Sequence, residues 1–282
     1  MLSLLAYTVI DVFTSTPLQG NQLGVFTEAL GLDAAQMQRL TREMNFAECT
    51  FVLPPEQGGD ARIRIFTPAQ ELPFAGHPVL GTAFVVGEAL GKDRVRLETG
   101  AGVVPLDLRR EDGRVVHGKM QQPIPKWGPY GRESELLQAL GVARSTLPVE
   151  SYRNGPEHIY VALGSEDEVA RLKPDQVALA RLGPIGANCF AGSGTRFKTR
   201  MFAPGLGVPE DPATGSAAGP LALHLARHGR IAFGAEIEIR QGAEIGRPSV
   251  LFASAHGSLA QIERVEVSGA AVVVARGHFE RY

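Results

Sequence analysis

The sequence is poor in cysteine and carries almost no net charge, and each shortage excludes a class of protein. Two cysteines among 282 residues, Cys49 and Cys189, are too few for a disulfide scaffold. No CxxC pair or cysteine–histidine cluster predicts a zinc site, so we expect no bound metal. A formal net charge of −2 provides no basic face of the kind that nucleic acids or anionic membranes bind. We therefore expect no nucleic-acid partner and no membrane partner.

Long hydrophobic runs are also missing. No apolar stretch approaches the ~20 residues that cross a bilayer. The N-terminal "MLSLLAYTVIDVF" is apolar, but no basic segment precedes it and Asp11 interrupts it, so it predicts a buried strand and not a signal peptide. With 44% hydrophobic and 21% charged residues, the composition is that of a globular protein with enough chain for two modest cores. We expect it to be cytoplasmic.

What the sequence does contain is an internal repeat. Residues 64–90, "RIFTPAQELPFAGHPVLGTAFVVGEAL", share a pattern with residues 200–228, "RMFAPGLGVPEDPATGSAAGPLALHLARH". An arginine, a phenylalanine and two prolines recur 136 positions apart (200−64, 202−66, 204−68, 209−73). Each copy then reaches a glycine and small or polar residues at the head of an apolar helix. The repeat predicts that one structural unit occurs twice.

The patterns around the repeat predict a mixture of strands and helices. Strands are expected at "LLAYTVIDVF", "LGVFTEAL", "ECTFVLP", "ARIRIFTP", "HIYVALG", "TRFKTRMF", "EIEIRQGAEIGRPSVLFA" and "RVEVSGAAVVVARG". A helix is expected over residues 33–45 with Asp33 as its N-cap. Further helices are expected from about Pro78 to Leu90 and near 215–228. In the meander after the first of these, "EDG" predicts a hairpin.

The expected fold class is α+β, with two pseudo-symmetric lobes. Each lobe is predicted to be a curved, mostly antiparallel sheet wrapped around a central helix. The segment at 121–134, rich in proline and glycine, is the natural boundary. We place the lobes at residues 1–126 and 127–282, and the last strand could cross back to the first lobe.

The two predicted helix starts suggest a binding site for an anion. A helix N-terminus carries unsatisfied N–H groups and a partial positive charge, and small residues leave those amides open. Duplicated elements should face one another across the lobe interface, where ligands often bind. We therefore expect a pocket for a small carboxylate at Gly76-His77 and Gly215-Ser216. The alternative is that these residues only cap their helices.

Three residues are candidates for chemistry in this pocket. Asp211 precedes the second helix, although it could be a simple N-cap. His77 would be disfavoured as a cation beside a positive helix end, so we expect a neutral imidazole, or a purely structural histidine. Glu48 begins a strand and points away from Cys49, which shares a face with large apolar residues and should be buried and unreactive. From the residues alone, Glu48 could equally be a surface side chain.

Several segments together resemble the phenazine-biosynthesis PhzF isomerases. They are "REMNFAECTFVLP", "GGDARIRIFTPAQELPFAGHPVLGTA" and "EDPATGSAAGPLALHLARHG", with "QGNQLGVF", "MQQPIPKW", "NGPEHIYVAL", "NCFAGSG" and "QGAEIGRPS". The resemblance covers essentially the whole chain. It implies a fold like that of diaminopimelate epimerase, with two pseudo-symmetric lobes, no cofactor and a homodimeric state. It also implies a small-molecule carboxylate as substrate, since the family isomerises trans-2,3-dihydro-3-hydroxyanthranilate to an aminoketone.

The resemblance also assigns roles to individual residues. The family's catalytic residues fall on Glu48, His77, Asp211 and Ser216. Glu48 lies in "AECTFV" where relatives commonly read "SESTFV", and both differences are conservative for a buried strand. The substrate-binding residues that it implies are Gly76, Gly215, Thr214 and Asn21. Glu48 would carry a proton from C3 to C1 of the ring, aided by a pKa that burial or nearby Asp211 raises. Asp211 and His77 would hold the amino and hydroxyl groups of the substrate.

Other activities remain as alternatives. Epimerases and racemases of related architecture use a pair of thiols, and Cys49 lies next to Glu48, but no cysteine occurs in "EDPATGSAAGP". The chain could also bind a metabolite without catalysis. His224 and His228 have the i, i+4 spacing of zinc ligands, but no carboxylate or third ligand accompanies them in the sequence. We expect that pair to lie at a solvated helix end.

Overall fold

The computed structural model describes residues 4–280. The chain divides into two compact units: unit 1 contains the residues up to 121 and those from 268 onward, and unit 2 contains residues 122–267. The sequence placed the boundary a few residues later, and it allowed the last strand to return to the first lobe. The first three residues of "MLSLLAYTVIDVF" lie outside the described range. Among the described residues, no helix is long and apolar enough to cross a membrane.

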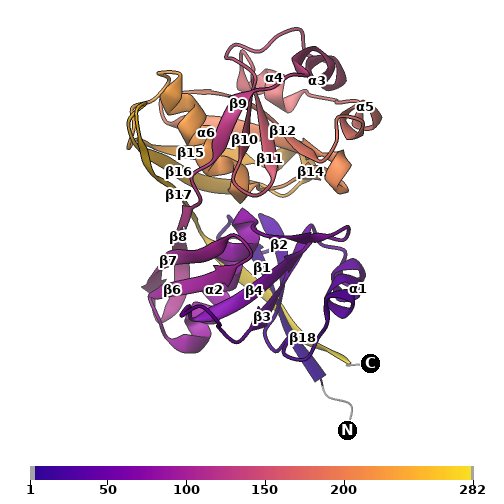
Figure 1. Ribbon diagram of the computed structural model, residues 1–282, viewed down its shortest axis with the longest axis vertical. Coiled ribbons are helices and arrows are strands. Elements are labelled where there is room, and N and C mark those ends of the chain that lie inside the picture. Colours follow the sequence, from indigo (N-terminus) through magenta and orange to yellow (C-terminus); the bar gives the residue numbers. More distant parts are fainter. Residues whose placement is uncertain (1–3, 281–282) are drawn as a thin grey trace. The chain divides into compact units, whose positions relative to one another are not determined.

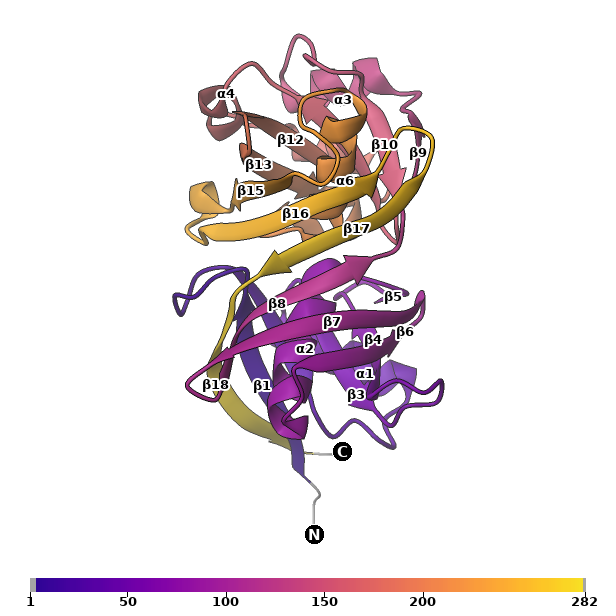
Figure 2. The same ribbon diagram turned by 90° about the vertical axis from the view of Figure 1, so that its left-hand side faces the viewer.

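Unit 1 contains nine strands and two helices among the described residues. The strands are β1 (Leu4–Val12), β2 (Asn21–Phe26), β3 (Glu48–Leu53), β4 (Ala61–Phe66), β5 (Glu71–Leu72), β6 (Arg94–Thr99), β7 (Gly102–Glu111), β8 (Arg114–Gln122) and β18 (Ala271–Glu280). The helices are α1 (Ala34–Met44) and α2 (Gly76–Leu90). Figure 2 shows β6, β7 and β8 passing across α2.

Strand pairing in unit 1 is mixed. β1 pairs antiparallel with β18 on one side and with β2 on the other. β2 and β3 are parallel, β3 and β4 antiparallel, and β4 pairs antiparallel with β5 and parallel with β6. β7 is antiparallel to both β6 and β8. The turn between β7 and β8 uses Asp112 and Gly113 at φ 49° and 79°, as the "EDG" signal predicts.

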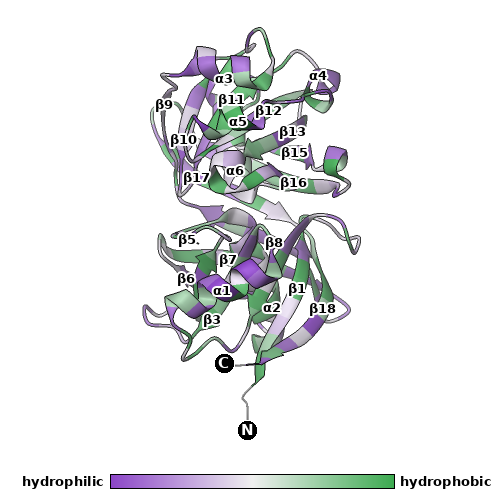
Figure 3. Ribbon diagram, turned by 90° about the vertical axis from the view of Figure 1, so that its right-hand side faces the viewer, coloured by the Kyte–Doolittle hydropathy of each residue, from purple (hydrophilic) through white to green (hydrophobic). Residues whose placement is uncertain are grey.

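Helix α2 forms the centre of unit 1. It contacts β1, β2, β3, β6 and β7, so strands from across the sheet surround it. Nearly every residue of α2 up to Gly87 is buried, as expected for a helix that is hydrophobic on all sides. Helix α1 is different, because only one face is buried; Figure 3 shows hydrophilic residues on the face of α1 that is turned to the viewer.

Unit 2 contains nine strands and four α-helices among the described residues. The strands are β9 (Lys126–Pro129), β10 (Glu150–Arg153), β11 (Glu157–Ala162), β12 (Ile185–Ser193), β13 (Arg196–Ala203), β14 (Val208–Asp211), β15 (Glu236–Gln241), β16 (Ser249–Gly257) and β17 (Ile262–Gly269). The helices are α3 (Glu133–Leu140), α4 (Glu166–Ala170), α5 (Gln176–Ala180) and α6 (Gly215–Arg227), with 3₁₀ turns at Pro204–Leu206 and Ala243–Ile245. Figure 1 shows where these elements follow one another along the chain.

The pairing in unit 2 repeats that in unit 1. β11 and β12 are parallel, β12 and β13 antiparallel, and β13 pairs antiparallel with β14 and parallel with β15. The same series runs through β2, β3, β4, β5 and β6. The central helix follows the short strand in both units, α2 after β5 and α6 after β14. The predicted α+β fold with two pseudo-symmetric units is therefore confirmed.

The predicted helices are confirmed with small changes at their ends. Asp33 is the N-cap of α1 in a full capping box with Gln36, and Asn45 ends the helix in the left-handed region. The segment at 121–134 is not simply a linker. It contains β9, which pairs antiparallel with β10. The sequence missed this strand because prolines and glycines flank so short an element.

Candidate active site

The first half-site lies at the N-terminal end of α2 in unit 1 and consists of Asn21, Glu48, Gly76 and His77. Ala75 is the N-cap residue, and no side chain caps the helix there. Pro78 follows at the third helical position, where a missing N–H costs nothing. The start of α2 thus presents the amides of Gly76 and His77 with the positive end of the helix dipole.

Glu48 and His77 lie together in this half-site. Glu48 is the first residue of β3; its side chain is 15% exposed, and its Oε2 lies 3.4 Å from Nε2 of His77. The alternative of a surface glutamate is therefore wrong. Strand alternation assigns a side chain to a face of the sheet but does not show what covers that face. Here helix α2 covers it.

His77 is a neutral imidazole. Burial lowers its pKa to about 3, opposed by a hydrogen bond with the backbone of Gln22. On the other side of the ring, Nδ2 of Asn21 lies 3.2 Å from Nδ1 of His77. A neutral ring that lies beside a carboxyl group can exchange hydrogen bonds with it without a permanent ion pair.

The second half-site lies at the N-terminal end of α6 in unit 2 and consists of Asp211, Thr214, Gly215 and Ser216. Thr214 is the N-cap residue, but its hydroxyl does not cap the helix. It donates instead to Oδ2 of Asp211 at 2.6 Å. Gln241 fixes this arrangement, because its Nε2 donates to the Asp211 carbonyl at 2.8 Å and to Thr214 Oγ1 at 2.9 Å. Asp211 is therefore not the N-cap of α6.

Ser216 is the second residue of α6, as His77 is of α2. Its hydroxyl lies 2.9 Å from Nε2 of His158 on β11, and its carbonyl accepts from Nδ2 of Asn154 at 3.0 Å. Ser216 and His158 are 5% and 2% exposed. Burial lowers the pKa of His158 to about 3, so this imidazole is also neutral.

The eight predicted site residues thus fall into two groups of four, one at each helix start. The sequence missed the residues that hold the second group, which are Asn154, His158, Asn188 and Gln241. They lie inside quoted segments, but only the strand register shows what they contact. Glu210, next to Asp211, is not available to a substrate, because both its oxygens bind Arg200, at 2.8 and 2.7 Å.

Neither cysteine is suited to acid–base chemistry. Both side chains are fully buried. Burial raises the pKa of Cys49 and of Cys189 to about 12. Thiols in this state are poor bases and nucleophiles, which counts against a thiol racemase.

A second cluster in unit 2 joins Glu150 to His224 and His228. The expectation that both histidines lie at a solvated helix end is wrong for His224, which is 0% exposed. Oε2 of Glu150 lies 3.1 Å from His224 Nδ1 and 3.0 Å from His228 Nε2, a spacing that could hold a metal. However, Arg227 binds the same oxygen at 2.6 Å. Burial opposes ionisation of Glu150, but the hydrogen bonds from His224, Arg227, His228 and Tyr152 together lower its pKa. A guanidinium thus already supplies the positive charge that a metal would bring.

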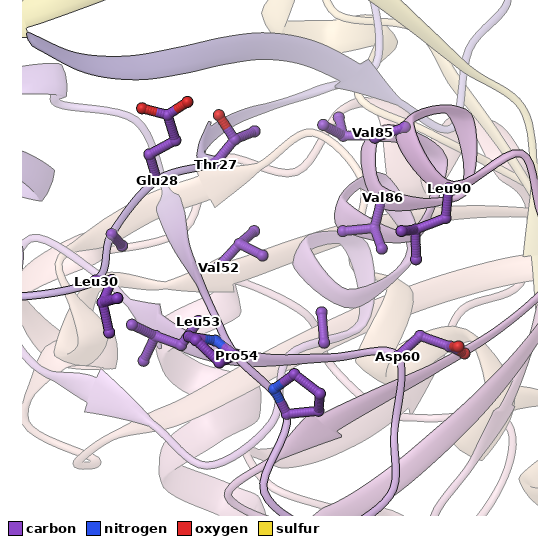
Figure 4. Close-up of a pocket in the computed structure, with 14 residues that line it drawn as sticks. Thr27, Glu28, Leu30, Val52, Leu53, Pro54, Asp60, Val85, Val86 and Leu90 are labelled. Atoms are coloured by element: carbon purple, nitrogen blue, oxygen red, sulfur yellow. The ribbon is translucent and has the colours of Figure 1, made fainter.

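Unit 1 also contains a groove of about 600 Å³ between the C-terminal half of α2 and the end of β3. Figure 4 shows Val85, Val86 and Leu90 of α2 on one side of it and Leu30 on the other. None of the predicted site residues lines this groove. Its walls are mainly aliphatic, with Glu28 and Asp60 as the carboxylates among the lining residues.

The duplicated unit with a buried central helix is a fold also found in solved structures of epimerases and of PhzF-family proteins. A hydroxyproline epimerase from Agrobacterium vitis has this fold, with a TM-score of 0.69 at 12% identity over 99% of this chain and 94% of that one. A PhzF-family phenazine biosynthesis protein from Bacillus anthracis superposes with a TM-score of 0.84 at 24% identity, covering 99% of both chains.

The chain belongs to the PhzC-PhzF family of phenazine biosynthesis-like proteins, whose model matches residues 10–277. It is 55% identical to the trans-2,3-dihydro-3-hydroxyanthranilate isomerase of Pseudomonas fluorescens over 271 residues, which cover 96% of this chain and 98% of that protein.

Proposed function

We propose that this protein is an isomerase that converts trans-2,3-dihydro-3-hydroxyanthranilate to an aminoketone in phenazine biosynthesis. The observation that carries the proposal is the placement of Glu48 against neutral His77 at an uncapped helix start, in a chain 55% identical to an isomerase of that name.

The helix starts would bind the carboxylate of the substrate. An anion at a helix N-terminus accepts hydrogen bonds from backbone amides and is favoured by the dipole. Gly76 and Gly215 carry no side chain that could fill this space, and neither N-cap residue competes for the amides. Each such contact with the anion is worth a few tenths to about 1 kcal/mol at an exposed site, and more when partly buried.

Glu48 would move the proton. Its carboxylate takes the proton from C3, the two ring double bonds shift, and the carboxylic acid returns the proton to C1. The resulting enol tautomerises to the aminoketone, so atoms and electrons balance without an added oxidant or reductant. A carboxylate that acts as a general base in this way typically contributes ~10²–10⁴-fold.

His77 and Asp211 would orient the substrate. A neutral imidazole can donate to or accept from the substrate hydroxyl and the Glu48 carboxyl group without adding charge. Asp211, held by Thr214, would accept from the substrate amino group. Asn21 would keep the His77 ring in place through its contact with Nδ1.

The reaction itself tests the proposal. We expect the protein to consume dihydrohydroxyanthranilate in D₂O. The NMR signal at C1 of the product then shows whether hydrogen or deuterium was returned to that carbon. A protein that leaves this compound unchanged under conditions in which the Pseudomonas enzyme converts it does not have the proposed function.

Glu48→Gln tests the assignment of the proton carrier. The amide cannot accept the C3 proton, so we expect turnover to fall by at least ~10²-fold. Binding of 3-hydroxyanthranilate, the aromatic analogue, should stay within a few-fold of wild type in a calorimetric titration. Deuterium incorporation by the variant at the wild-type rate would show that another group carries the proton.

We also propose a homodimer located in the cytoplasm. The support is the family resemblance, together with two cysteines that are buried and free. Sedimentation equilibrium of the purified chain tests the first part, and fractionation of the producing cells tests the second.

A further inference from the structure

The strand registers show which residues of the two units correspond. In unit 1, Phe66 pairs with Cys49, and in unit 2 the matching Phe202 pairs with Ala187. Cys49 and Ala187 are therefore equivalent positions, and so are the residues that precede them, Glu48 and Gly186. Across the parallel pair, Glu48 faces Leu23 and Gly186 faces His158.

The two units therefore place different polar groups against the second residue of their central helix. In unit 1 the group is Glu48, whose Oε2 lies 3.4 Å from His77 Nε2. In unit 2 the equivalent of Glu48 is a glycine, and a Cβ added there would lie 2.8 Å from His158 Nδ1. The imidazole of His158 takes the space that a side chain at Gly186 would need, and it reaches Ser216 Oγ at 2.9 Å.

The hydrogen bonds around His158 determine which ring nitrogen carries the proton. Asn188 Nδ2 contacts the carbonyl of Gly186 at 2.9 Å, and a carbonyl only accepts, so this atom is the amide nitrogen. The same nitrogen lies 3.3 Å from His158 Nδ1, which must then accept. In a neutral imidazole the other nitrogen, Nε2, bears the proton and donates to Ser216 Oγ.

We propose that His158 is a positioning residue that fixes the hydroxyl of Ser216 as a hydrogen-bond donor toward the substrate carboxylate. This rests on the proposed function and on the family resemblance, which places Ser216 among the catalytic residues. Because Ser216 Oγ accepts from His158, its own proton is directed to another acceptor. A carboxylate only accepts hydrogen bonds. The substrate carboxylate would therefore accept one from the Ser216 hydroxyl in addition to those from the amides at the start of α6.

The tautomer can be tested without any assay of activity. In ¹⁵N–¹H spectra of the ¹⁵N-labelled wild-type protein, we expect His158 to be neutral and protonated at Nε2 throughout pH 5.5–8. The assignment is made by comparison with His158→Gln, which lacks these signals. A ring protonated at Nδ1, or one that becomes cationic in this range, would overturn the proposal even if the enzyme is fully active.

Three variants test the effect on the ligand. His158→Leu removes the donor and installs the residue that unit 1 has at the equivalent position, Leu23. His158→Gln keeps an N–H near the place of Nε2. Ser216→Ala removes the hydroxyl itself. Thermal melting of each variant shows whether it is folded.

We expect both Ser216→Ala and His158→Leu to weaken binding of 3-hydroxyanthranilate. The loss should be roughly tenfold for Ser216→Ala, because it removes a hydrogen bond to a charged group. It should be several-fold for His158→Leu. In turnover, KM should rise more than kcat falls, and His158→Gln should restore most of the loss. In the Ser216→Ala background, His158→Leu should cost nothing further, since the two act through one hydroxyl.

Full additivity of these two losses, or wild-type affinity in His158→Leu, would overturn the role of His158. Absence of turnover in the wild-type protein would refute the proposed function alone, because the tautomer and the binding of 3-hydroxyanthranilate are measured without turnover.

Discussion

At the scale of single residues, the neighbours Glu48 and Cys49 on β3 lie in different surroundings. Cys49 is fully buried in the core of unit 1 with Phe51 and Leu53. Glu48 points to the other face of the strand, toward α2, where its Oε2 meets His77. Strand alternation thus keeps a thiol out of a site that contains a carboxyl group one residue away.

Cys49→Ala should leave turnover unchanged, because the thiol is held neutral and out of reach. We expect a loss of about 1 kcal/mol in the free energy of unfolding, from the small cavity that it leaves. Iodoacetamide should likewise leave the wild-type enzyme active, as measured by substrate consumption. Inactivation that the Cys49→Ala variant escapes would reopen the thiol mechanism.

The sequence indicated the state of single side chains better than it indicated their surroundings. Local pattern indicated the buried thiol and the neutral state of His77, while resemblance supplied the importance of Glu48 and Ser216. His158 could not be found, because a histidine in a strand gives no sign of what it faces. Its role depends on a register between strands far apart in sequence, and only the fold supplies that.

At the scale of elements, α6 contains a proline that the fold accommodates with a side chain. Pro220 has no N–H, so the carbonyl of Ser216, four residues earlier, lacks its helical partner. Nδ2 of Asn154 donates to that carbonyl at 3.0 Å. The chain between β10 and β11 thus completes the first turn of the helix that forms the second half-site.

Asn154→Ala should therefore destabilise unit 2. It leaves the buried Ser216 carbonyl without a donor, which costs about 1–3 kcal/mol. Pro220→Ala should cost less in the Asn154→Ala background than in wild type, because an alanine at this position restores the missing N–H. Urea denaturation of the four proteins measures this coupling. Strict additivity would mean that Asn154 does not replace the helical hydrogen bond.

Long elements with a clear period could be predicted, whereas short ones could not. Helix α1 follows from its cap and its apolar spacing, and α2 and α6 from the repeat. The short strand β9, by contrast, has only four residues, and a glycine and a proline are among them. Its pairing with β10 is decided by tertiary contacts that no local pattern reports.

At the scale of the whole molecule, the repeat is visible in side chains as well as in topology. Arg64 binds Glu71 with two hydrogen bonds, at 2.7 and 2.6 Å, and lies over Phe66. Arg200 binds Glu210 in the same way and lies over Phe202. The recurrence of the arginine and phenylalanine 136 positions apart therefore reflects an ion pair that joins β4 to β5 in unit 1 and β13 to β14 in unit 2.

Each unit also buries one neutral histidine at its helix start, and this makes the stability of the protein dependent on pH. The pKa values of His77 and His158 are both about 3 in the folded state, against about 6.5 when unfolded. Below pH 6.5 the unfolded chain binds protons that the folded chain does not, so stability falls as the pH falls. Each histidine contributes up to about 1.4 kcal/mol per pH unit, and the lowered pKa of His224 acts in the same direction.

We expect the free energy of unfolding in urea to decrease steeply between pH 6.5 and 4.5 at constant ionic strength. His158→Leu is the matched variant, because leucine occupies the equivalent position in unit 1 and cannot titrate. It should lower stability at pH 7 yet reduce the slope below pH 6.5 by about one proton, and the two proteins should converge as the pH falls. If the variant keeps the wild-type slope, His158 is protonated in the folded state, and the neutral imidazole beside Ser216 would have to be abandoned.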